Sequence, residues 1–129
     1  MKKLLFALAV LFTATTAATA QVVVDGVNIN NIQEVQMIRM IAQERFLSNK
    51  VTIFIDYGQS INGGARNRME VIDPRSDDRI KFNSVMHAVN YLIANGWVYQ
   101  EAMVLPNEGS ANTTGSTQYI FVRDRDQSR

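Results

Sequence analysis

The absence of cysteine is the feature of this 129-residue sequence that most constrains its fold. Many small secreted domains compensate for a thin hydrophobic core with disulfide bonds, and this chain cannot form any. Its stability must come from side-chain packing and backbone hydrogen bonds alone. A chain of this length buries roughly 60–70% of its unfolded surface, which is enough for one modest core. The lack of cysteine also excludes thiol nucleophiles, redox pairs and thiolate metal sites.

The first 20 residues have the order of a secretory signal peptide, with a positive start, an apolar run and a cleavage site of small residues. Two lysines precede the apolar run 4–12, and Ala18-Thr19-Ala20 matches the A-x-A cleavage pattern. We therefore expect cleavage between Ala20 and Gln21, and an exported protein that is periplasmic or extracellular. The apolar run is too short to span a bilayer, so no stable membrane insertion is expected after cleavage.

Removal of this leader changes the formal net charge from +1 to −1, because it takes away two lysines and no acidic residue. A near-neutral chain lacks the basic surface of a nucleic-acid binder, so no nucleic-acid partner is expected. A single domain is predicted over residues 21–122, followed by a disordered polar tail at 123–129. One histidine in the whole chain excludes zinc sites with two or three histidines, and we expect neither a metal nor another cofactor.

The first half of the mature chain is predicted to be extended. Residues 22–32 place valines and isoleucines around the turn-forming pair Asp25-Gly26, which indicates an edge strand. Residues 33–47 fit both a helix and a strand; their periodicity slightly favours a helix, whereas a family resemblance described below favours a strand. Residues 50–57 alternate in the manner of a strand and are rich in β-branched side chains. Two further short strands are expected across a turn, at 69–72 and 79–82.

The clearest helix begins at Asn83 or Ser84, either of which is a suitable N-cap, and ends near Asn95, where Gly96 supplies a C-terminal cap. Strands are predicted on both sides of a polar loop, at 97–105 and 117–122. Short connections favour antiparallel pairing, with the helix laid over the sheet. The sequence thus predicts an α+β fold, a small antiparallel β-sheet with one main α-helix packed on one face.

Two stretches resemble known small domains. The first is Asp56-Tyr57-Gly58-Gln59. The second runs from Lys81-Phe82-Asn83-Ser84 through Asn95-Gly96-Trp97 to Tyr119-Ile120-Phe121-Val122. The helix, the Gly-Trp pair and the final strands resemble the signature of DUF4177-like small domains of unknown function, as in short exported proteins of Bacteroides-type bacteria. The resemblance covers most of the mature chain loosely and residues 81–122 best. It implies an α+β fold with the helix against the sheet. It implies no reaction, because the family carries no settled activity.

The loop at 58–68 is the most favourable place for a binding surface, because polar and aromatic side chains are concentrated there. The candidate binding residues at this loop are Tyr57, Gln59, Asn62, Arg66 and Arg68. Two further candidates, Trp97 and Tyr99, point to one face of their strand. If that face meets the helix, Trp97 belongs to the core. Otherwise the two rings form an aromatic platform suited to a carbohydrate or a peptide.

Groups suited to catalysis are sparse. His87, the only histidine, is predicted on the helix face away from the core, with no carboxylate on the helix to orient it. We therefore expect a solvated or capping histidine. Asp73, Asp77 and Asp78 lack the spacing of a calcium loop and are interleaved with arginines, which favours a plain surface turn. The glycines of the 58–68 loop lack the residues that complete a phosphate-binding loop.

These patterns favour a non-catalytic protein-binding module of the cell envelope, which contacts an envelope protein through a sheet edge or the 58–68 loop. Two alternatives stay open. One is a small-ligand or glycan-binding protein that uses the two aromatic rings. The other is a small hydrolase that uses carboxylates such as Asp56 and Glu70 with His87. No residue is assigned as catalytic, and the oligomeric state is not predicted.

Overall fold

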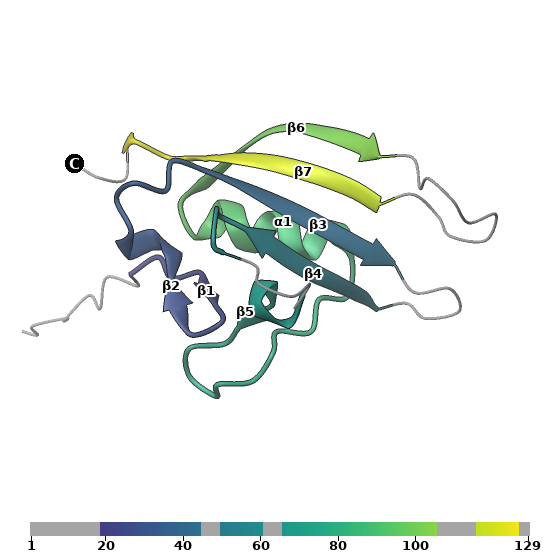
Figure 1. Cartoon of the computed structure of the whole chain (residues 1–129), viewed down its shortest axis with the longest axis horizontal. Coiled ribbons are helices and arrows are strands. Elements are labelled where there is room, and N and C mark those ends of the chain that lie inside the picture. Colours follow the sequence, from purple (N-terminus) through teal and green to yellow (C-terminus); the bar gives the residue numbers. More distant parts are fainter. Residues whose placement is uncertain (1–18, 45–49, 61–65, 106–115, 127–129) are drawn as a thin grey trace, which may run out of the picture.

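A computed structural model describes residues 19–44, 50–60, 66–105 and 116–126 of the chain. Within these ranges the protein is mainly β with one α-helix, so its broad class is α+β, as predicted. The strands form two antiparallel sheets rather than the single sheet expected (Figure 1). No helix in the described part of the chain is long and apolar enough to cross a membrane. Most of the predicted leader lies outside these ranges.

The larger sheet has four strands in the order β4-β3-β7-β6, and every neighbouring pair is antiparallel. Its strands are β3 (Met37–Glu44), β4 (Val51–Asp56), β6 (Trp97–Leu105) and β7 (Ser116–Arg123). Strand β3 resolves the ambiguity at 33–47 in favour of a strand. Buried Ile38, Met40 and Ala42 alternate along it with more exposed residues, which is the period of two that a sheet with one buried face requires.

The smaller sheet has the order β2-β1-β5 and consists of β1 (Val23–Val24), β2 (Val27–Asn28) and β5 (Val71–Ile72). Asp25 and Gly26 form its hairpin turn with φ of 49° and 78°, as the Asp-Gly pair predicted. The edge strand expected at 22–32 is instead this hairpin followed by the short 3-10 helix η1 (Ile29–Asn31).

The strand expected at 79–82 does not form. Arg79 makes one isolated bridge to Ile72, and Phe82 makes another to Val51 of β4. The chain therefore crosses from one sheet to the other within four residues, which leaves no room for a continuous ladder. Glu70 makes a similar single bridge to Phe54, directly after the 3-10 helix η3 (Arg66–Met69).

Helix α1 (Val85–Ala94) has the ends that the sequence predicted. The Ser84 hydroxyl accepts a hydrogen bond from the backbone N–H of His87 at 3.1 Å and forms the N-cap. Asn95 follows the last turn, and Gly96 adopts a φ of 85°, which a residue with a Cβ disfavours.

One cluster of buried side chains joins both sheets and the helix. Helix α1 contributes Ala88, Val89 and Leu92 to it. Figure 1 shows the helix running behind the four-stranded sheet, with the small sheet below. The members contributed by the strands and their connections are Val22, Val24, Ile29, Val35, Ile38, Met40, Ala42, Ile53, Ile55, Val71, Phe82, Trp97 and Phe121.

Arg123, the last residue of β7, connects this strand to the segment 29–35. Its guanidinium donates hydrogen bonds to four backbone carbonyls at 2.8 to 3.2 Å, and it lies 5.1 Å from the centre of the Trp97 ring. The N–H of Asp124 donates to the carbonyl of Gly96 at 2.9 Å. The prediction of a disordered tail from residue 123 is therefore wrong for Arg123 and Asp124, because backbone carbonyls bind the charged group that was expected in solvent. The four acceptors belong to Ile29, Asn30, Ile32 and Val35.

Candidate functional site

Two candidate binding residues of the 58–68 loop, Tyr57 and Gln59, take part in contacts within the domain. The side chain of Gln59 accepts from the N–H of Tyr57 and donates to the carbonyl of Ile55, both at 2.8 Å. Tyr57 is partly buried and packs against the core. Arg68 is exposed, whereas Asn62 and the side chain of Arg66 lie outside the described part of the structure.

The structure separates the two candidates of the aromatic platform. Trp97 is 1% exposed, and its indole N–H lies 3.4 Å from the Asn30 side-chain oxygen, which accepts its hydrogen bond. Its ring therefore offers no free face to a sugar or a peptide. Tyr99 is exposed and packs edge-to-face against Phe121, with 5.8 Å between ring centres. Trp97 is a core residue, the first of the two alternatives considered for it.

Each of the three groups named for a hydrolase has another partner. Asp56 is paired with Arg39, and Glu70 is paired with Arg79 at 2.6 Å. Nδ1 of His87 accepts a hydrogen bond from the backbone N–H of Asn83 at 3.3 Å, in keeping with a capping role. In the described ranges, no group of three or more histidine or acidic side chains could hold a metal ion.

Strand β6 forms one edge of the four-stranded sheet, and all its residues after Trp97 are exposed. Glu101 is its single charged residue. Natural edge strands commonly carry charges or proline, which oppose pairing with a second chain. Here the described chain exposes nine large hydrophobic side chains, and five of them lie on this strand, namely Val98, Tyr99, Met103, Val104 and Leu105.

A β-bulge interrupts the pairing of β6 with β7. The register shifts between Tyr99 and Glu101, so Gln100 is an extra residue on the edge strand. A shallow pocket of about 440 Å³ lies beside the bulge. Its lining comes from β3, β6 and β7 and consists of Met37, Gln100, Glu101, Met103 and Ile120. The edge strand thus adjoins a small hollow with an apolar part.

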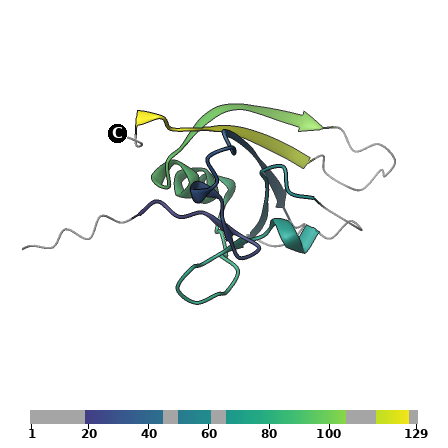
Figure 2. The same ribbon diagram turned by 60° about the vertical axis from the view of Figure 1, so that its left-hand side comes forward.

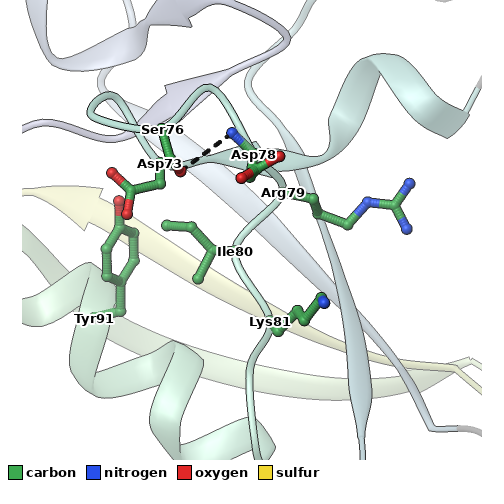
Figure 3. A pocket seen from close by; sticks show the side chains of 7 residues that line it. All are labelled: Asp73, Ser76, Asp78, Arg79, Ile80, Lys81 and Tyr91. Atoms are coloured by element: carbon green, nitrogen blue, oxygen red, sulfur yellow. Dashed lines mark hydrogen bonds between the residues drawn. The ribbon is translucent and has the colours of Figure 1, made fainter.

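A second pocket, of about 720 Å³, lies between helix α1 and the turn that follows β5 (Figure 3). In Figure 3 the carboxylate of Asp73 faces the hydroxyl of Tyr91, and the side chain of Arg79 turns away from them. The sequence predicted only a surface turn here, since helix and turn are brought together by the tertiary fold. The lining residues are Asp73, Ser76, Asp78, Arg79, Ile80, Lys81 and Tyr91.

The phenol of Tyr91 lies partly buried at this pocket, close to the charge of Asp73. Burial, and after it the negative charge of Asp73, raise the pKa of the Tyr91 phenol above its ordinary value. The hydroxyl therefore stays protonated at neutral pH and donates a hydrogen bond to the carbonyl of Gln21 at 3.2 Å.

Comparisons with protein-family models, with curated proteins and with solved structures found no match to this chain. The resemblance to DUF4177-like domains stays a prediction. Two places in the described structure could bind a partner or a ligand, the β6 edge and the pocket beside Tyr91.

Proposed function

We propose that the protein is a non-catalytic binding module of the cell envelope, and that it binds another protein by adding a strand of that partner to β6. The observation that carries this proposal is the exposed edge itself, nine residues long with a single charge. An edge strand presents unpaired N–H and C=O groups, and a partner strand satisfies them through main-chain hydrogen bonds.

The surroundings of β6 support strand addition at this edge. Met37 and Met103 are exposed and line the same pocket, so the sheet has an open apolar area next to β6. In Figure 2 the far ends of β6 and β7 extend past the helix. An added strand would place alternate side chains on the two faces, so one of them could enter the pocket beside the bulge. Main-chain pairing supplies affinity and such pockets supply specificity.

The test is affinity capture of the tagged, exported chain from chemically crosslinked envelope, with two matched variants. Val104→Lys places a charge on the most exposed apolar side chain of β6, which is 68% exposed. Met86→Lys makes a comparable change on helix α1, where the side chain is 58% exposed. We expect one dominant partner, retained by M86K and lost by V104K, together with slower hydrogen exchange of β6 amides in the purified complex.

Either of two results would contradict the proposal. One is that V104K and M86K capture the same partner in equal amounts. The other is a complex in which β6 amides exchange as fast as in the free protein, because strand addition must protect them.

A second candidate function, the binding of a small polar ligand, is favoured by the pocket of Figure 3. Its volume fits a small molecule, and it combines carboxylates with the ammonium group of Lys81. A thermal-shift screen of envelope metabolites would test it. We expect any stabilising compound to lose its effect in Lys81→Ala and to keep it in the β6 variant V104K.

A further inference from the structure

Gln21 is held by two side chains from the end of helix α1. Its backbone N–H donates to the side-chain oxygen of Asn95 at 2.9 Å, and its carbonyl accepts from the hydroxyl of Tyr91 at 3.2 Å. Both contacts span 70 or more residues of sequence, so they are tertiary contacts. We call the pair Asn95 and Tyr91 the Gln21 seat.

Further hydrogen bonds orient the seat. The side-chain amide of Asn95 donates to the carbonyl of Tyr91 at 2.8 Å, which fixes its oxygen toward Gln21. The side chain of Asn30 donates to the Asn95 carbonyl at 2.7 Å and accepts from the N–H of Val22 at 3.1 Å. Val22 itself is fully buried. The backbone is therefore held continuously from residue 21 onward.

The same residue follows the A-x-A pattern of the predicted leader. Thr19 is exposed and Ala20 only partly buried, whereas the next two residues are bound. Hydrolysis of the Ala20–Gln21 bond adds one water: the new carboxylate leaves on Ala20 with the leader, and the new amine on Gln21 takes up a proton. The nitrogen that donates to Asn95 thereby becomes an ammonium group with three donors.

We propose that Asn95 and Tyr91 form a binding site for the N-terminus of the mature protein, generated when a signal peptidase cleaves between Ala20 and Gln21. A charged donor strengthens the hydrogen bond to Asn95, because charge-assisted hydrogen bonds are shorter and about twice as strong as neutral ones. Both backbone groups of Gln21 are engaged in the folded domain. The peptidase therefore reaches this bond before the segment docks. The proposal rests on the predicted leader and not on binding at β6.

The first test is the N-terminus of the full-length gene product after export. Intact mass and N-terminal sequencing are expected to show a chain that begins at Gln21 with a free amine. A different first residue would overturn the proposal. Predominant pyroglutamate would also overturn it, because the amine would then have attacked the side-chain amide of Gln21 and released ammonia instead of occupying the seat.

The second test is hydrogen exchange of the amides at residues 22–24 in the exported protein. Tyr91→Phe removes the hydroxyl but keeps the ring, which packs edge-to-face with Phe82 at 5.6 Å. We expect these amides to exchange about fivefold faster in Y91F, the effect of one hydrogen bond. Tyr99→Phe makes the same change at a site outside the seat and should leave them unaltered.

Equal exchange in Y91F and wild type, with folding verified by circular dichroism, would overturn the seat while leaving the cleavage site intact. Asn95→Ala provides a further variant, because it removes both the acceptor for the N-terminus and the amide that donates to the carbonyl of Tyr91. It should also accelerate the exchange of residues 22–24, and exchange as slow as in the wild type would count against the proposal.

Discussion

At the scale of single residues, Arg123 shows how one charged side chain can bind several uncharged partners. Four carbonyls of the segment 29–35 converge on one guanidinium, and Trp97 packs against it. The segment contains η1 and one turn, so its carbonyls have no strand partner. A planar group with five donors in a fixed arrangement matches such a set, which a lysine ammonium cannot.

Arg123→Ala is expected to lower the free energy of unfolding by about 2–3 kcal/mol, because several carbonyls lose a charged donor. Arg123→Lys should lower the free energy of unfolding by an intermediate amount. Urea unfolding monitored by circular dichroism measures both. Arg75→Ala is the control, since that side chain is 94% exposed and lies 3.9 Å from Asp73; a change within about 0.5 kcal/mol is expected there. Equal effects of R123A and R75A would refute this role for Arg123.

At the scale of elements, the helix shows how much a local signal can specify. Ser84 and Gly96 define its two ends through a side-chain acceptor and a positive φ, and neither depends on what the helix packs against. The strands differ, because a two-residue segment such as β1 exists only through its neighbours on both sides.

Ser84→Ala should destabilise the protein by about 1 kcal/mol, since the N–H of His87 loses its acceptor. Ser84→Asp keeps an acceptor and adds a negative charge at the helix N-terminus, so its stability should stay close to that of the wild type. Thermal and urea unfolding of the two variants compare them directly. A destabilisation by S84D equal to that by S84A would show that the cap contributes little.

Gly96→Ala should cost about 1–2 kcal/mol, because an alanine at a φ of 85° is strained. Gly96→Asn is the matched comparison, since asparagine tolerates the left-handed region better than alanine. We expect the order wild type, G96N, G96A in urea midpoint. If G96A matched the wild type, the turn between α1 and β6 would have to adopt another conformation.

At the scale of the whole molecule, one hydrophobic cluster joins both sheets and the helix, so we expect the domain to unfold as a unit. Trp97, the single tryptophan, lies inside this cluster and reports tertiary structure through its fluorescence. The urea transition followed by Trp97 fluorescence should coincide with the transition followed by far-UV circular dichroism. Separate midpoints would indicate that the small sheet or the helix unfolds independently.

The stability of the molecule should fall in alkaline solution. Burial first, and then the Asp73 charge, raise the pKa of Tyr91 above 10.0, and burial followed by Glu44 and Tyr99 acts likewise on Tyr119. Above pH 10 the unfolded chain loses these protons more readily than the folded one, so the free energy of unfolding decreases as pH rises. Urea unfolding from pH 8 to 11 measures this, and Tyr91→Phe should reduce the slope.

The candidate surfaces illustrate where prediction from sequence stops. A sheet edge was foreseen as a binding surface, but nothing local to 97–105 shows that β6 is an outer strand while β3 is an inner one. Gln59 looked available for binding, yet its amide completes the turn after β4. The pocket beside Tyr91 joins two segments whose proximity depends on the whole fold.

By itself, the sequence determined the α+β class, the strands at β4, β6 and β7, both helix ends and the Asp-Gly turn, whereas it left β3 open between a strand and a helix. These follow from periodicity, propensity and backbone conformation, which act over a few residues. Only the tertiary structure decided that there are two sheets, that β6 is exposed, that Trp97 is buried and that Arg123 is bound rather than free. Those outcomes depend on strand order and on contacts between distant segments, and local sequence carries little information about either.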